Sequence, residues 1–496
     1  MDLNVITGSL SGWIWNIAML VLCIAIGLFY TVRLRAPQVR LVRDMGYYLF
    51  KGKSSETGTS SFQSFAIALS GRVGTGAIAG VATAICFGGP GAVFWMWVIG
   101  ILGAATAFAE ATLGQIWKEE IKGEYRGGPA YYIEKGLGSK FKWLAVIFAV
   151  CAVIANGFTG PTVQSHTIAE GIHNAFGISP LVTGIGLAVI FALIVFGGIK
   201  RIAKFAQLIV PFMAIGYIIV SLIILVANAS AIPSMFGLIF KSAFGTEALF
   251  GGIIGSTILW GIKRGVYASE AGMGTGAQAA ASAEVSHPVK QGLAQSFSVY
   301  VDILFVCTAT ALMILATGMY NVQDGAGAFL TEGLQGIEPG PGYTQEAVNT
   351  VFPGFGAGFV AVALLFFAFT TIVSFAFYTD NNIAYLFKKN RNYKWIQNAL
   401  KCLIIVMIIF GAVRSAEVAW NMADIGVGLT VWVNLIALIL LTKPVHLALK
   451  DYERQKKLGL DPVFDPNEAG IKNADLWFDI VKNKFGNLNK GKAEKV

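Results

Sequence analysis

The chain has 496 residues, of which 55% are hydrophobic and 13% are charged, and its formal net charge is +9. Soluble globular proteins carry roughly 25% charged residues, so this composition excludes a soluble domain and indicates a protein that crosses a membrane many times. The positive residues lie mainly in short loops between apolar segments, which reflects membrane topology and not nucleic-acid binding.

Eleven apolar segments are candidate membrane spans, since a span takes about 20 residues. No basic residue precedes the first segment, so we expect it to be a retained helix and not a cleaved signal. The predicted spans are 13–33, 61–87, 90–116, 141–163, 180–197, 203–227, 248–270, 290–317, 352–378, 396–412 and 418–442.

Loop charge supports this count. The segment 34–60 is basic, whereas the segment 164–179 and the long loop 318–351 contain no Lys or Arg. Because Lys and Arg are enriched in cytoplasmic loops, the alternation predicts an N-terminus outside the cell and a C-terminus in the cytoplasm. Lys263 and Arg264, at the end of an apolar segment, are assigned to the cytoplasmic side.

Clustered glycines interrupt two of the predicted spans. A glycine costs about 1 kcal/mol relative to alanine in a helix interior, so each cluster predicts local unwinding. Unwound backbone at membrane depth is tolerated where it is buried or lines a cavity, and transporters use it to bind substrates and ions. The alternative is that the glycines serve close helix packing. The first break, in span 61–87, holds Gly71, Gly74 and Gly76. The second, which begins in span 248–270, holds Gly255, Gly261, Gly265, Gly272, Gly274 and Gly276.

The positions of the two breaks predict an internal repeat. If the first span is an extra helix, ten remain as two sets of five, and an odd number inverts one set relative to the other. Each set then begins with a broken helix. The predicted segments are 1–60, the extra helix with a basic loop; 61–228 and 229–442, the two repeats; and 443–496, a cytoplasmic tail of low hydrophobicity.

Four stretches resemble the alanine/glycine:cation symporter family, and specifically its bacterial sodium/alanine branch: GRVGTGAIAGVATAICFGGPGAVFWMW, YRGGPAYYIEKGLG, GIKRGVYASEAGMGTGAQAAA and HPVKQG. The resemblance implies an all-α integral membrane protein of eleven transmembrane helices. Its fold would be the LeuT-type five-plus-five inverted repeat with one extra N-terminal helix. It also implies sodium-driven uptake of alanine or glycine, with D-alanine as a further candidate, across the bacterial inner membrane.

The chain departs from the family pattern at both breaks. The family usually reads GTGN in the first broken helix, where this chain has Ala77 after the second glycine. It usually reads SNEAG in the second, where Ser269 stands in the asparagine position. The loss of an amide side chain at each break bears on substrate preference.

The breaks supply groups that suit a zwitterionic amino acid. Free N–H groups at the start of a half-helix favour a carboxylate, and Gly74, Thr75 and Gly76 are the candidates. An ammonium needs carbonyls or neutral oxygens, for which Ala268 and Ser269 are the candidates.

The resemblance implies further binding residues. Gln164 matches a glutamine that the family places at its substrate pocket, although an interhelical hydrogen bond is the alternative for this side chain. Sodium needs oxygen ligands, and the resemblance implies carbonyls of the first broken helix, around Gly71, with hydroxyls of Thr370, Thr371 and Ser374; Thr370 is also a candidate substrate contact. Alternatively, these hydroxyls bond carbonyls of their own helix.

Ionisable residues within spans are candidate functional groups. Glu110 could take part in coupling or in structural pairing, and Arg72 could be a gate charge or a structural partner. Asp302 could neutralise a cation or anchor Lys263 or Arg264. Glu270 is a further candidate. The four histidines and five cysteines show no metal-ligand spacing, and no phosphate-binding GxxxxGK[ST] motif occurs. We therefore expect no enzyme activity and no organic cofactor. The expected ligands are sodium, an amino acid and the lipid bilayer; a proton-coupled carrier or a channel are the alternatives.

Overall fold

The computed structural model describes residues 3–51, 55–197, 199–247 and 249–485, and this part of the chain is predominantly helical. The first helices are α1 (Leu3–Ile14), α2 (Ile17–Arg33), α3 (Pro37–Arg40), α4 (Val42–Leu49), α5 (Ser61–Arg72), α6 (Val81–Gly88), α7 (Ala92–Ile116), α8 (Pro129–Leu137), α9 (Lys142–Ile154), α10 (Gly160–Phe176), α11 (Pro180–Val195), α12 (Ile199–Ala227) and α13 (Ile232–Ala243). They are followed by α14 (Ile254–Ser269), α15 (Thr275–Ala281), α16 (Pro288–Tyr300), α17 (Thr308–Thr317), α18 (Pro341–Asn349), α19 (Gly356–Phe387), α20 (Tyr393–Ala412), α21 (Ala416–Leu440), α22 (Thr442–Lys457), α23 (Pro466–Ala469) and α24 (Leu476–Ile480).

Short elements connect these helices. The π-helical turns are η1 (Gly76–Gly80), η3 (Ala155–Thr159), η6 (Val301–Cys307) and η7 (Val481–Phe485), and the 3-10 turns are η2 (Ser139–Phe141), η4 (Ala229–Ala231) and η5 (Gly251–Ile253). The strands β1 (Glu119–Ile121) and β2 (Glu124–Arg126) form one antiparallel hairpin, and β3 (Asn321–Gln323) and β4 (Phe329–Glu332) form another.

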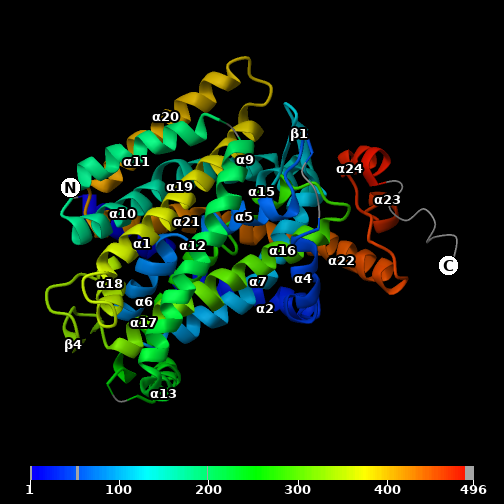
Figure 1. Ribbon diagram of the computed structural model, residues 1–496. Coiled ribbons are helices and arrows are strands. Elements are labelled where there is room, and N and C mark those ends of the chain that lie inside the picture. The colour runs from blue at the N-terminus through cyan, green and yellow to red at the C-terminus, as the bar shows by residue number, and fades with distance from the viewer. Residues whose placement is uncertain (1–2, 52–54, 198, 248, 486–496) are drawn as a thin grey trace.

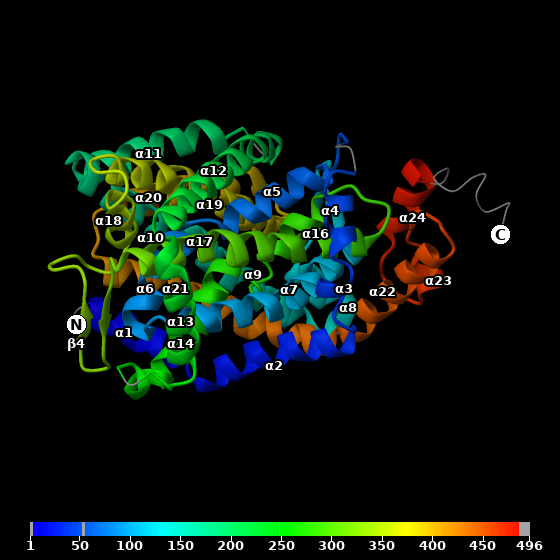
Figure 2. The same cartoon turned by 60° about the horizontal axis from the view of Figure 1, so that its bottom comes forward.

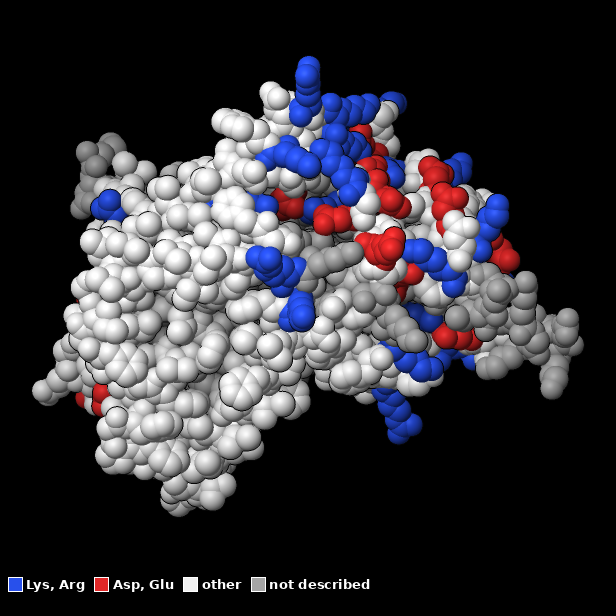
Figure 3. All heavy atoms as spheres, turned by 45° about the horizontal axis from the view of Figure 1, so that its top comes forward, with Lys and Arg blue, Asp and Glu red and all other residues white. Residues whose placement is uncertain are grey.

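The helices form an elongated bundle (Figures 1 and 2). Helix α1, α18 and strand β4 lie at one end, and β1 with α22, α23 and α24 lies at the other. Figure 3 shows that on one face the charged side chains gather toward this second end, while most of the remaining surface is uncharged. We call the end that carries β1, α22, α23 and α24 the charged end.

Exposed apolar side chains cover the uncharged part of the surface. Helix α12 alone exposes Leu208, Phe212 and Val226, each by more than two thirds. Such a surface is unfavourable in water and stable in hydrocarbon, whereas backbone polar groups are satisfied within the helices. The arrangement fits a multi-pass membrane protein.

Among the described residues, seven helical segments are long and apolar enough to cross a membrane, and two bent helix pairs raise the number to nine. The bent pairs are α1 with α2, at 44°, and α5 with η1 and α6, at 50°. The two other predicted spans coincide with the shorter helices α11 and α14. A helix therefore lies at each predicted position, while the number of eleven crossings stays a prediction.

The first predicted span, 13–33, begins too late. The helix starts at Leu3, bends at Trp15 and Asn16, and continues as α2. The stretch 3–14 contains Thr, Ser and Gly among its apolar residues, and its Ser11 and Ile14 are buried. The Asn16 side chain accepts a hydrogen bond from Met19 N and thereby caps α2.

The C-terminal tail is folded onto the charged end. Trp477, in α24, is fully buried, and its indole Nε1 donates to the Gln115 carbonyl at 2.9 Å. The Phe464 amide donates to the Ser286 carbonyl at 2.8 Å, beside the loop between α15 and α16. The low average hydropathy of the tail does not predict this packing, because only a few aromatic residues make the contacts.

Candidate functional site

The first broken helix is built as the glycine cluster predicts. Helix α5 begins with a capping box, in which Ser60 accepts from the Gln63 amide and Gln63 accepts from the Ser60 amide. It ends at Arg72, and the chain resumes helical structure at Gly76 with a 50° change of direction. All residues from 64 to 86 are buried, so the unwound backbone lies inside the protein and not in lipid.

The second break follows α14. Glu270 has φ 52°, in the left-handed region that a residue with a side chain rarely adopts, and Gly272 and Gly274 have φ 95° and 78°. Helix α15 then starts at Thr275, whose hydroxyl donates to Glu270 Oε2 at 2.8 Å. The chain therefore unwinds just after the apolar segment, at Gly272 and Gly274. Within the segment the prediction is wrong, because Gly255, Gly261 and Gly265 lie inside the uninterrupted helix α14.

The two breaks touch each other. A Cβ atom added to Gly76 would lie 3.0 Å from the Tyr267 ring and 3.1 Å from the Ala268 Cα, so any side chain here would press against the second break. Arg72 Nε donates to the Ser269 carbonyl at 2.6 Å. The predicted substrate residues on either side are thus brought together, but the Ser269 carbonyl is already occupied by Arg72.

Gln164, from α10, bridges the two breaks. Its Oε1 accepts from the Thr75 amide at 3.0 Å, and its Nε2 donates to the Tyr267 hydroxyl at 3.2 Å. The side chain is buried, and so is the Thr75 hydroxyl, which has no hydrogen-bond partner within the described residues. Gln164 thus makes the interhelical hydrogen bonds that were the alternative interpretation of this side chain. A carboxylate bound here would compete with Gln164 Oε1 for the Thr75 amide.

Two of the three predicted sodium hydroxyls face the first broken helix. Thr371 Oγ1 lies 2.7 Å from the Ser70 carbonyl, and Ser374 Oγ lies 3.0 Å from the Ile67 carbonyl. Thr370 Oγ1 contacts the Phe367 carbonyl of its own helix at 3.0 Å. Thr371 Oγ1 also donates to the Phe367 carbonyl of its own helix at 3.0 Å. The hydroxyls of Thr371 and Ser374 therefore stand beside carbonyls of α5, whereas the Thr370 hydroxyl has only the intrahelical contact among the described residues.

The predicted glycines lie at the same junction. A Cβ atom on Gly74 would collide with Thr371 Oγ1 and lie 3.0 Å from Gln164 Oε1. On Gly71 it would lie 2.8 Å from the Tyr378 hydroxyl and 2.9 Å from Glu270 Oε2. Neither position has room for a side chain, which explains why both are glycine.

Glu110 braces the second break. Its Oε1 accepts from the Gly274 amide at 3.1 Å and from Asn434 Nδ2 at 2.5 Å, while Asn434 Nδ2 also donates to the Gly272 carbonyl at 2.9 Å. The carboxylate is fully buried in α7. Glu110 thus makes the structural pairing that was one of its two interpretations from the sequence. No sequence pattern predicted Asn434 as its partner.

Arg72 is a buried positive charge whose hydrogen bonds go to uncharged groups of the described residues. Beside its bond to Ser269, its Nη1 donates to Gln295 Oε1 at 3.2 Å and contacts the Ser298 hydroxyl. It also interacts electrostatically with Glu110, Glu270 and Asp302. In each carboxylate one oxygen lacks a hydrogen-bond partner in the described structure. Arg72 thus joins the two breaks as a structural partner.

Lys263 and Arg264 are not loop residues, so counting them among the loop charges is wrong. They lie inside α14, before the break, and both are buried. Lys263 Nζ is 2.6 Å from Asp424 Oδ2, and Arg264 Nη1 is 2.9 Å from Asp424 Oδ1, in α21. Asp424, and not Asp302, is therefore their anchor. The error has a physical cause. In the sequence, a buried cation that is paired within the protein interrupts an apolar segment in the same way as a cation in a loop.

The residue in the first family position, Ala77, lies outside the contacts between the breaks. Its carbonyl accepts from the Thr310 hydroxyl at 2.7 Å, and Thr310 in turn contacts the Tyr217 hydroxyl at 2.7 Å. These bonds connect η1 to α17 and α12. Neither Tyr217 nor Thr310 was indicated by the sequence, since isolated hydroxyls in apolar helices carry no pattern.

Comparisons with known proteins agree on one family. The model described as the sodium:alanine symporter family matches residues 1–466. YrbD of Bacillus subtilis (strain 168) is 60% identical over 469 residues, which cover 95% of this chain and 96% of that protein. The sodium/proton-dependent alanine carrier protein of Bacillus sp. (strain PS3) is 50% identical over 89% of this chain and 98% of its own length.

A solved structure supports the fold. A crystal structure of a mutant manganese transporter from Eremococcus coleocola matches with a TM-score of 0.54 at 12% identity, over 87% of this chain and 97% of that one. At this identity the similarity concerns the arrangement of helices alone.

Proposed function

Because the chain belongs to the sodium:alanine symporter family, and is thus a membrane transporter and not an enzyme, we propose that it carries alanine and other small neutral amino acids together with sodium. Glycine and D-alanine are included among the proposed substrates. One observation carries the proposal: two broken helices and α10 meet at Gln164, with buried hydroxyls of α19 beside the first break. Such a junction is where transporters of this architecture bind substrate and ion.

We also propose the eleven-helix, LeuT-type arrangement with the N-terminus outside and the C-terminus in the cytoplasm of a bacterium. A helix at each predicted position supports it, as do breaks in the first helix of each proposed repeat. The gathering of charged side chains at the end that carries α22 supports a cytoplasmic location of that end.

For the substrate carboxylate we propose the Thr75 amide as the principal partner. This amide lies at the start of the helical segment formed by η1 and α6, where the positive end of the helix dipole favours an anion. In the present arrangement Gln164 Oε1 accepts from it. A bound carboxylate would replace that oxygen, and the unpartnered Thr75 hydroxyl would supply a second donor. The ammonium would lie toward the Ala268 carbonyl.

The Gln164→Ala variant tests this geometry. Without the amide, the Thr75 amide and Tyr267 hydroxyl lose their buried partners, which costs about 1–3 kcal/mol. We expect the KM for alanine to change by tenfold or more at saturating sodium, measured as uptake into proteoliposomes. Gln323→Ala, in the β3 hairpin, is the control and should leave the KM within twofold. An unchanged KM in Gln164→Ala would exclude this side chain from the substrate site.

Energetics permit coupling to a single sodium ion. A zwitterion carries no net charge, so one sodium moves one positive charge, worth about 2.3 kcal/mol at 100 mV. A tenfold sodium gradient adds about 1.4 kcal/mol. The sum supports an accumulation of several hundredfold.

The function itself is tested by alanine uptake into proteoliposomes with sodium replaced by potassium at a matched membrane potential. We expect saturable uptake that falls to background without sodium. Uptake that is unchanged when potassium replaces sodium, but that depends on a pH gradient, would indicate the proton-coupled alternative. Flux that does not saturate with alanine concentration would indicate a channel.

A further inference from the structure

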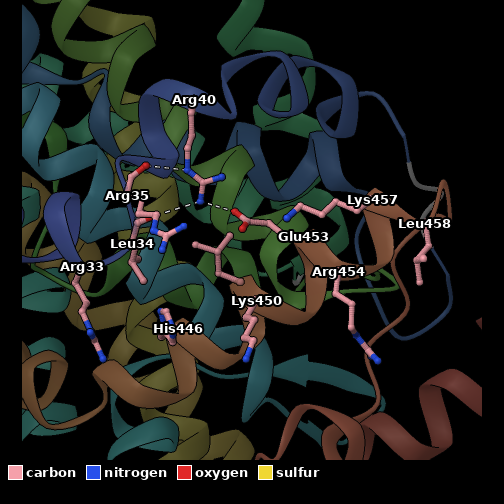
Figure 4. Close-up of a pocket in the computed structure, with 11 residues that line it drawn as sticks. Arg33, Leu34, Arg35, Arg40, His446, Lys450, Glu453, Arg454, Lys457 and Leu458 are labelled. Atoms are coloured by element: carbon pink, nitrogen blue, oxygen red, sulfur yellow. Dashed lines mark hydrogen bonds and ion pairs between the residues drawn. The ribbon is translucent and has the colours of Figure 1, made fainter.

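A cavity of about 570 Å³ lies outside the transport site, between the end of α2, the turn into α3, and helix α22 (Figure 4). We call it the basic cavity. Six of its lining residues are Arg or Lys and only one, Glu453, is acidic; the six are Arg33, Arg35, Arg40, Lys450, Arg454 and Lys457. Nothing in the proposed transport cycle uses them.

The positive charge of the basic cavity is only partly neutralised. Arg40 pairs with Glu453, and Arg454 pairs with Asp451 at 2.6 Å and with Glu468 at 2.9 Å. The remaining four cations, Arg33, Arg35, Lys450 and Lys457, make no ion pair with a carboxylate of the described residues. Like charges gathered in this way repel each other, so the site favours an anionic ligand.

The backbone holds these cations in place. Arg35 and Ala36 adopt φ 58° and 49°, so the chain reverses sharply where α2 ends. The Ala36 amide donates to the Thr31 carbonyl at 2.6 Å, and the Tyr300 hydroxyl donates to the Gln38 carbonyl at 3.1 Å. Arg40 Nε donates to the Arg35 carbonyl at 2.8 Å. The turn is thus fixed from several sides.

The basic cavity begins where two membrane spans end. Arg33 is the last residue of α2, and α22 follows directly after α21; the Tyr30 hydroxyl joins the two spans by donating to the Leu438 carbonyl at 2.6 Å. Immediately before the cavity, Val32 of α2 is 70% exposed and Leu440 of α21 is 52% exposed. An apolar surface suited to acyl chains therefore leads directly to a cluster of cations.

We propose that the basic cavity binds the phosphate headgroup of an anionic phospholipid, whose acyl chains lie against α2 and α21. Guanidinium groups match phosphate oxygens in a bidentate manner, and ammonium groups add point charges. Basic pockets beside the ends of membrane helices bind such headgroups in general. The proposal rests on membrane insertion and not on sodium coupling, so its failure would leave the proposed transport function intact.

The test uses the purified full chain in a neutral detergent and native mass spectrometry of bound lipid. The probes are phosphatidylglycerol, phosphatidylcholine and inorganic phosphate. We expect phosphatidylglycerol to bind with defined stoichiometry, and the triple variant Arg33→Gln, Arg35→Gln, Lys450→Gln to weaken it by about tenfold or more. The single variant Lys450→Gln, at an exposed position, should weaken it by a smaller factor.

The matched control is Lys389→Gln, Arg391→Gln, Lys394→Gln. These three cations are also exposed, Lys389 and Arg391 between α19 and α20 and Lys394 in the first turn of α20, and none of them lines the cavity. Equal weakening in both triple variants would mean non-specific attraction and would overturn the proposal. It would also be overturned if phosphatidylcholine bound equally well, or if inorganic phosphate at the same concentration displaced phosphatidylglycerol, which would indicate a soluble anion as the ligand.

Discussion

Replacing Thr371 and Ser374 together with alanine raises the sodium concentration for half-maximal alanine uptake by tenfold or more. The two hydroxyls lie 2.7 and 3.0 Å from the carbonyls of Ser70 and Ile67, so oxygens of helix α19 stand in pairs with oxygens of helix α5. A sodium ion there would replace two hydrogen bonds with oxygen–cation contacts. A tenfold change corresponds to about 1.4 kcal/mol, which is modest for the loss of two oxygen ligands.

Thr370→Ala is the matched control for this result. It removes a hydroxyl from the same helix, but that oxygen contacts only the Phe367 carbonyl one turn earlier in the described structure. We expect less than a threefold change in the half-maximal sodium concentration. The measurement is initial alanine uptake at fixed membrane potential over a sodium series. An equal effect of both variants would place the cation elsewhere, and Glu270 or Asp302 would then be the next residues to replace.

The paired breaks could be predicted from the sequence because their cause is local. Clustered glycines weaken a helix wherever they stand, and the backbone after Arg72 and after Ser269 indeed leaves the helical path. The hydroxyls of α19 were predicted through family resemblance. The structure distinguishes the two threonines because Thr371 contacts the Ser70 carbonyl of α5 as well as its own helix, whereas Thr370 contacts its own helix alone among the described residues. Local composition could not make that distinction, since neighbouring residues on a helix face different partners.

The remaining contacts join residues far apart in the chain. Asn434 meets Glu110 across 324 positions, and Tyr267 meets Gln164 across 103. No periodicity in the sequence relates such partners. The contact between Glu110 and Asn434 at the second break, and the contact between Gln164 and Tyr267, could therefore be found only in the structure. The misplacement of Lys263 and Arg264 has the same origin, because charge counting cannot see the carboxylate in α21.

The most destabilising substitution follows from that carboxylate. Asp424 holds two buried cations, and its backbone carbonyl accepts from Trp15 Nε1 at 2.9 Å. Asp424→Ala leaves both cations buried without a counter-charge, which costs about 3–5 kcal/mol. We expect a large fall in the thermal unfolding midpoint of the purified protein. Glu468→Ala, which breaks an exposed pair with Arg454, should change stability by about 0.5 kcal/mol or less.

A compensated variant separates charge burial from packing. In Lys263→Met, Arg264→Met, Asp424→Leu no ionised group is left at this junction, so the desolvation cost disappears together with the attraction. We expect the unfolding midpoint to return most of the way to that of the unmodified chain. Alanine uptake should stay reduced even so, because Arg264 stacks 4.1 Å from the Trp420 ring, which packs against Tyr267 beside Gln164. An Asp424→Ala protein as stable as the original would contradict the argument, and full uptake by the triple variant would limit the triad to a role in stability.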